Sequence, residues 1–94
     1  MTRPKLDPWA CCAECGSNNS LHLHHVFGGT KAKRRASEQY GCLEYLCWHH
    51  HEGKDGVHSN EELSLKYKRK HQQRLEDDGM SRDEFRMLFG KSYL

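Results

Sequence analysis

Two pairs of possible metal ligands in this 94-residue chain share the same short spacing. Two residues separate Cys12 from Cys15, and the same spacing recurs between Cys47 and His50. A two-residue spacer lets one turn, or the first turn of a helix, aim both side chains at a single ion, and two such pairs complete a tetrahedral zinc site. The sequence therefore predicts a structural Zn²⁺ bound by three thiolates and one imidazole.

Two further cysteines leave the ligand assignment partly open. Cys11 directly precedes Cys12 and is an alternative ligand, although Cys12 has the two-residue spacing and Gly16 follows Cys15 to relax the turn. Cys42 falls in a predicted strand, where we expect a small, buried, apolar side chain. A lone Cys-x-x-Cys also fits a redox pair, and the second pair with its histidine is what favours zinc.

Histidines gather beside the second ligand pair and at the end of a predicted strand. His24 and His25 are adjacent, so on a strand their side chains point to opposite faces. His51 follows His50, and on a helix these two side chains lie about 100° apart. We therefore expect His24 and His51 to form a second, open metal site, with His25 beside it but not bound to the metal.

The spacing of the other histidines says less about the role of each. His58 fits a third metal ligand, a phosphate contact or a structural residue. We expect His22 to be an exposed strand residue, and His49 and His71 to be surface or packing residues.

These residues together resemble a known motif. The segments that carry the resemblance are Cys12-x-x-Cys15, Leu23-His24-His25-Val26 and Leu46-Cys47-x-x-His50-His51. They look like the zinc-braced form of the HNH endonuclease motif, a ββα-metal (treble-clef-like) finger common in small phage and prophage nucleases. The resemblance covers residues 12–58. It implies that His24 and His51 bind a catalytic divalent cation, that His25 is the general base, and that both spaced pairs hold the structural zinc.

The chain departs from the HNH pattern at two positions. The family's middle asparagine, which orients the general base, falls near Cys42, and a thiol lacks the donor and acceptor of an amide. Its substitute would have to be Ser37, Glu38, Gln39 or a backbone carbonyl. The family often has another histidine one turn past the metal ligand, where this chain has Asp55. His58 follows three residues later and is the candidate third ligand.

Residue patterns predict the elements that hold these side chains. Strands are expected over 21–27 and 40–46, with residues 30–36 as a basic loop between them, and a short helix opens at Cys47. A helix over 61–78, capped by Ser59 or Asn60, has one apolar stripe. That stripe consists of Leu63, Tyr67, His71 and Leu75. A capping box of Ser81 and Glu84 begins a last helix that Gly90 ends.

The predicted fold class is α+β in a single domain, 1–94. A small zinc-bound ββα-metal finger occupies residues 12–58, and a helical extension with two helices occupies residues 59–94. Hydrophobic residues make up only 35% of the chain, and so small a domain rarely gains more than about 3–5 kcal/mol from its core alone. A structural zinc contributes on the order of 10 kcal/mol in small peptides, which would offset the deficit.

The charge and hydropathy of the chain indicate which partners and which location to expect. The formal net charge is only +2, but two basic runs, residues 30–36 and 66–71, contain no acidic residue and suit contact with phosphates. In the first run we expect Lys31, Lys33, Arg34 and Arg35 to bind backbone phosphates. No apolar run is long enough to cross a membrane, and no secretory signal is visible, so a cytoplasmic location is expected. The family resemblance adds a bacterial host cell, phage or prophage as the source.

The sequence therefore predicts a metal-dependent endonuclease that hydrolyses phosphodiester bonds of duplex or branched DNA. The cation at the open site would be Mg²⁺, Mn²⁺, Ni²⁺ or Zn²⁺. The sequence does not indicate an oligomeric state, and a homodimer is one option. Two alternatives stay open: a catalytically silent zinc finger that binds nucleic acid, and a phage-encoded factor that binds another protein. Neither alternative requires His24, His25 and His51 together.

Overall fold

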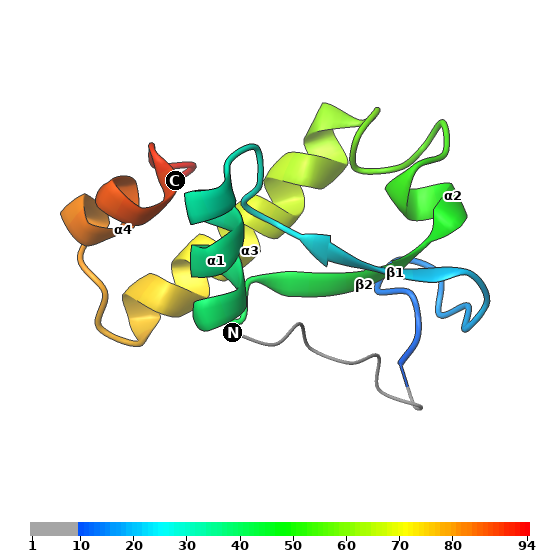
Figure 1. Cartoon of the computed structure of the whole chain (residues 1–94), viewed down its shortest axis with the longest axis horizontal. Helices are drawn as coiled ribbons and strands as arrows, with labels where there is room; N and C mark the ends of the chain where they lie inside the picture. Colours follow the sequence, from blue (N-terminus) through cyan, green and yellow to red (C-terminus); the bar gives the residue numbers. More distant parts are fainter. Residues whose placement is uncertain (1–9) are drawn as a thin grey trace.

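The computed structural model describes residues 10–94. Over that range the architecture is α+β, as predicted, with one two-stranded sheet and four helices (Figure 1). The first nine residues of the predicted domain lie outside that range. The elements are β1 (Leu21–His25), α1 (Lys31–Gln39), β2 (Leu43–Cys47), α2 (Trp48–His51), α3 (Glu61–Asp77) and α4 (Arg82–Phe89). Within the described range, no helix is both long and apolar enough to cross a membrane.

The two strands pair antiparallel in a register that fixes which residues meet at each end of the sheet. Leu21 lies opposite Cys47, and His25 lies opposite Leu43. The start of β1 and the end of β2 therefore share one end of the sheet, where α2 begins. At this end the N–H of Ala13 donates to the carbonyl of Tyr45 at 2.9 Å, which ties the segment before β1 to β2.

The predicted basic loop over 30–36 is wrong, because these residues open helix α1. The Thr30 side chain accepts a hydrogen bond from the N–H of Lys33 at 3.2 Å and so caps the helix. Lysine, arginine and alanine, which fill the first turns, are good helix formers. The run of cations had suggested a loop, although Thr30 already marked a helix start. A helix thus separates the two strands.

Both predicted strands are confirmed, with shifted ends. β1 stops at His25, two residues earlier than expected, and the chain then turns so that Phe27 enters the core. The Phe27 ring lies 4.3 Å from that of Phe89 and 5.3 Å from that of Phe85, measured between centroids, so α4 packs on the end of β1. Cys42 is fully buried, as predicted, and precedes β2.

The helical extension follows the sequence pattern closely. Asn60 caps α3 by accepting from the N–H of Leu63 at 3.3 Å, and Ser81 caps α4 by accepting from the N–H of Glu84 at 3.1 Å. The apolar stripe of α3 faces inward, with Leu63 half-buried and the rest of the stripe buried. Gly90, at φ 93°, ends α4 in a conformation that favours glycine.

Polar contacts from α3 fasten it to the sheet. Glu44 on β2 accepts from His71 Nε2 at 2.8 Å and from Lys70 Nζ at 2.9 Å. Arg74 Nη2 lies 3.2 Å from His71 Nδ1, so the neutral imidazole accepts there and donates to Glu44. Burial raises the pKa of Glu44, but the hydrogen bonds from His71 and Lys70 outweigh it and leave the pKa lowered.

The Glu44→Gln variant should therefore be less stable at neutral pH. We expect it to lose about 1–3 kcal/mol in the free energy of unfolding, because it removes the charge that His71 and Lys70 bind. A lowered folded-state pKa contributes stability above the unfolded value and loses it in acid. The difference from wild type, measured by urea unfolding across pH, should shrink as the pH falls below about 4.5. A difference that stays constant with pH would contradict this.

Candidate metal centres

The fold brings the four predicted zinc ligands into one cluster. Cys15 Sγ lies 3.8 Å from Cys47 Sγ, while His50 Nδ1 lies 3.3 Å from Cys47 Sγ and 3.6 Å from Cys12 Sγ. A tetrahedral zinc with Zn–S of about 2.3 Å and Zn–N of about 2.0 Å has edges of about 3.8 Å between sulfurs and about 3.5 Å between sulfur and nitrogen. All four ligand atoms lie within 4.8 Å of one another, so the cluster could hold zinc.

Local backbone geometry aims these ligands inward. Cys12 donates its N–H to the carbonyl of Ser17 at 2.7 Å and accepts from Gly16 at 2.9 Å, which closes a turn around the first pair. Gly16 has φ 75°, where a side chain would be strained. Cys47 is the N-cap of α2, so His50 lies in the first helical turn, on the same side as the Cys47 thiol.

The structure places Cys12, and not Cys11, in the cluster. Cys12 is 2% exposed, whereas Cys11 is exposed to solvent. Burial raises the pKa of the Cys12 thiol, but backbone N–H groups, that of Cys47 first, outweigh it and lower the pKa to about 6. The backbone N–H of His50 likewise lowers the pKa of Cys47. These directions favour the thiolate, which is the form that binds metal.

The second cluster contains three histidines from three parts of the chain. His51 Nε2 lies 3.1 Å from His58 Nε2, and the His24 ring lies 5.1 Å from the His51 ring and 5.4 Å from the His58 ring, between centroids. One nitrogen from each falls within 4.8 Å of the others, so this group also could hold a metal ion. His58, whose role the sequence left open, lies with the two predicted ligands.

Two glycines allow the loop after α2 to fold back and carry His58 there. A Cβ at Gly53 would lie 2.4 Å from the carbonyl oxygen of His49, and one at Gly56 would lie 2.8 Å from that of His51. Neither position tolerates a side chain without moving the loop. The N–H of Val57 then donates to the carbonyl of His50 at 2.9 Å, which fixes the approach of His58.

Two histidines of the cluster, His24 and His51, favour the neutral form. Burial lowers the pKa of His24 to about 3, and positive charge on His51 and His58 would lower it further. Burial also lowers the pKa of His51. A neutral imidazole has the free lone pair that a metal requires. The two clusters thus differ in chemistry: three thiols with one imidazole in one, and imidazoles alone in the other.

His22 is not the exposed residue we expected. It is half-buried, and its Nδ1 lies 2.8 Å from Nδ1 of His51. His22 and His24 lie on one face of β1. Nδ1 of His51 faces His22 and its Nε2 faces His58, so each ring nitrogen of His51 has a histidine neighbour. His22, His51 and Glu52 make a third group of possible ligands. Among the other histidines, His49 is exposed and His71 is buried.

His25 lies between two hollows. One hollow, of about 250 Å³, is shared with His24 and His58, and the other, of about 200 Å³, is shared with Glu38 and basic residues of α1. His25 Nε2 lies 2.8 Å from Glu38 Oε1. Because a carboxylate accepts, Nε2 carries a proton and donates it to Glu38. Of the residues considered as substitutes for the family's asparagine, Glu38 contacts His25.

Helix α1 divides the four predicted phosphate-binding cations. Lys31, Arg34 and Arg35 line the hollow beside His25 and Glu38. The ammonium nitrogen of Lys33 lies 3.3 Å from the point that a Cβ at Gly90 would occupy, so Lys33 points toward the C-terminal segment. In the sequence these four cations form one run. In the structure, the rotation of successive residues around α1 directs Lys33 away from the other three.

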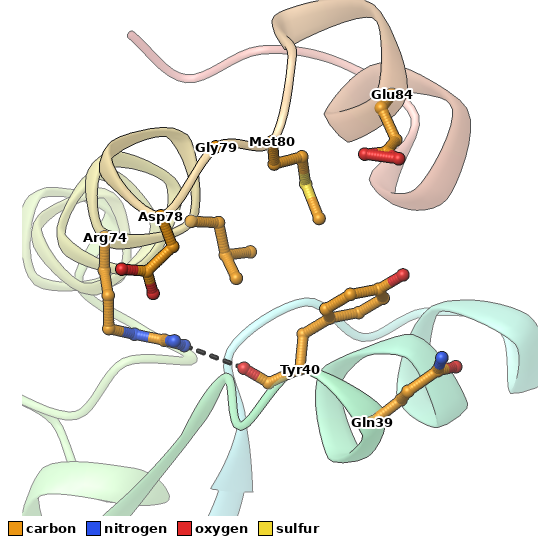
Figure 2. A pocket seen from close by; sticks show the side chains of 8 residues that line it. Gln39, Tyr40, Arg74, Asp78, Gly79, Met80 and Glu84 are labelled. Atoms are coloured by element: carbon orange, nitrogen blue, oxygen red, sulfur yellow. Dashed lines mark hydrogen bonds between the residues drawn. The ribbon is translucent and has the colours of Figure 1, made fainter.

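A larger hollow, of about 450 Å³, lies among α1, α3 and α4 and shares no lining residue with either metal cluster (Figure 2). Arg74 and Tyr40 cross it, with Arg74 Nη2 donating to the Tyr40 carbonyl at 2.9 Å. Asp78, Met80 and Glu84 complete its rim. Although this hollow is larger than the two beside His25, none of its lining residues belongs to the histidine cluster.

The zinc assignment predicts different outcomes for the two neighbouring cysteines. Cys12→Ser should lose more than about 3 kcal/mol of the roughly 10 kcal/mol that such a zinc contributes, and should lose tightly bound zinc. Cys11→Ser, the matched control, should keep both, because its thiol lies outside the cluster. Thermal unfolding and metal content after dialysis measure the two effects. A stable Cys12→Ser protein with one tight zinc, beside a zinc-free Cys11→Ser protein, would move the ligand to Cys11.

No protein-family model, curated protein or solved structure matches this chain. The resemblance to HNH endonucleases therefore rests on the sequence motif alone.

Proposed function

We propose that this protein is a metal-dependent endonuclease that hydrolyses phosphodiester bonds in DNA, built on a zinc-braced ββα-metal finger of the HNH type. The observation that carries the proposal is the position of His25. It lines one hollow with two candidate metal ligands and a second hollow with three cations of α1. A phosphodiester held between these hollows would meet a base, a cation site and positive charge together.

His25 is the general base in this proposal. Glu38 holds the Nε2 proton, which leaves Nδ1 to take a proton from the attacking water. The contact also fixes the orientation of the ring, which is the task of the asparagine in the HNH pattern. Both side chains are largely shielded, at 20% exposure for His25 and 14% for Glu38, so the pair is sheltered from competing water.

Three histidines, His24, His51 and His58, are the ligands proposed for the catalytic cation. A divalent cation bound there would neutralise charge on the phosphate and stabilise the departing oxygen. Three protein ligands leave coordination positions for substrate, whereas the four-ligand cysteine cluster is closed and structural. Lys31, Arg34 and Arg35 contribute backbone contacts, which depend on salt and carry no sequence preference of their own.

The proposal predicts that His25→Ala abolishes nicking while leaving the fold and the structural zinc intact. General-base catalysis contributes on the order of 10²–10⁴-fold, so the nicking rate should fall by that factor. Glu38→Ala should give a smaller loss, because it frees the ring without removing the base. The nicking rates of the wild type, His25→Ala and Glu38→Ala are measured from the relaxation of supercoiled plasmid with Mg²⁺, Mn²⁺ or Ni²⁺.

His49→Ala is the matched control, because this exposed histidine lies outside both clusters. It should nick plasmid as the wild type does. Full activity of His25→Ala would contradict the endonuclease assignment. DNA binding without cutting under any cation would favour the silent zinc finger, and absence of DNA binding would favour the protein-interaction factor.

A further inference from the structure

Three lysines from distant parts of the chain meet beside the C-terminal segment. They are Lys33 on α1, Lys68 on α3 and Lys91 just after α4, and the structure places the C-terminal end beside the start of α1 (Figure 1). Lys68 Nζ lies 5.0 Å and Lys91 Nζ 5.3 Å from the centroid of the Tyr93 ring. We call Lys33, Lys68 and Lys91 the lysine trio.

Tyr93 gives the trio a fixed platform. Its ring lies 5.7 Å from that of Phe27, between centroids, and its N–H donates to Gln72 Oε1 at 2.7 Å. Two ammonium groups over one aromatic ring gain cation–π attraction, which holds them near each other despite their repulsion. The platform rests on the aromatic core, so the positions of Lys68 and Lys91 follow from the fold.

Within residues 10–94, the lysine trio has no acidic partner at contact distance. None of its members takes part in an ion pair among residues 10–94, unlike Lys66 and Lys70 on the same helix, which pair with Glu14 and Glu44. Burial lowers the pKa of Lys68, and Lys91 and Lys33 lower it further, with Glu61 opposing them. Uncompensated positive charge held together by the fold is relieved by a bound anion.

Lys68 also connects the trio to the histidines. It lines the hollow of about 250 Å³ that contains His24, His25 and His58, and Ser64, one helical turn earlier, lines the same hollow. An extended polyanion in this hollow therefore meets Lys68 first and the other two lysines next. A nucleic-acid strand, with one charge per nucleotide, has the chemistry and the continuity to occupy both places.

We propose that the lysine trio binds a backbone phosphate of the DNA strand whose scissile phosphate lies in the histidine hollow. This inference rests on the proposed endonuclease function and assigns the helical extension to the substrate site. It adds Lys68 and Lys91, which the basic run of α1 does not include. Lys33 then belongs to this second contact, apart from Lys31, Arg34 and Arg35.

The test is the salt dependence of DNA binding. A fluorescently labelled short duplex is titrated with zinc-loaded protein in a series of KCl concentrations without added Mg²⁺ or Mn²⁺. Lys68→Gln/Lys91→Gln should weaken binding several-fold and reduce the slope of log Kd against log salt by about 1, as expected for one lost phosphate contact. Lys68→Arg/Lys91→Arg should keep the wild-type slope.

Arg82→Ala/Arg86→Ala is the matched control, because it removes the same net charge from exposed cations that have acidic neighbours on or beside α4. Its slope should stay near that of the wild type. A Gln variant with the wild-type slope, or a control that lowers the slope equally, would overturn the phosphate contact. A wild type that binds an acidic protein surface but not the duplex would overturn it too.

Nicking by the same proteins separates the two proposals. If the slope of the Gln variant falls by about 1 and no protein nicks plasmid under any cation, the phosphate contact stands and the endonuclease function fails. If wild type nicks plasmid and the Gln variant keeps the full slope, the endonuclease function stands and the phosphate contact fails.

Discussion

The meeting of Cys12 and Cys15 with Cys47 and His50 is the constraint on which the rest of the structure depends. It joins the turn before β1 to the first turn of α2 across the end of a two-stranded sheet, which has little stability alone. Glu14, within that turn, accepts hydrogen bonds from Lys66 and Tyr67, so α3 is fastened to the same point. A chain with few apolar residues thus gains a rigid centre from one closed cluster.

The same constraint positions the chemistry. Once Cys47 and His50 fix α2, His51 points away from the cysteines and toward β1, where His24 lies. The glycine-dependent turn after α2 then carries His58 to the same place. Two clusters with different ligand chemistry therefore lie on neighbouring faces of one short helix. The cysteine-rich cluster suits a structural ion, and the cluster of three imidazoles leaves coordination positions open.

The ligand spacing predicted most of the site because it depends on local geometry alone. A pair two residues apart meets one ion wherever the fold places it, and the apolar stripe of α3 marks a buried face by its period. The rest depended on tertiary contacts. His22 shares a strand face with His24, but only the position of α2 shows that it meets His51. The pairing of Glu38 with His25 required helix α1, which the density of cations had concealed.

The separation of two candidate metal sites by α2 can be measured by anomalous diffraction at the zinc edge, from crystals grown with Zn²⁺. Two peaks per chain are expected. One should lie among Cys12, Cys15, Cys47 and His50, and the other among His24, His51 and His58. A single peak at the cysteine cluster, or a second peak bounded by His22, His51 and Glu52, would contradict this separation.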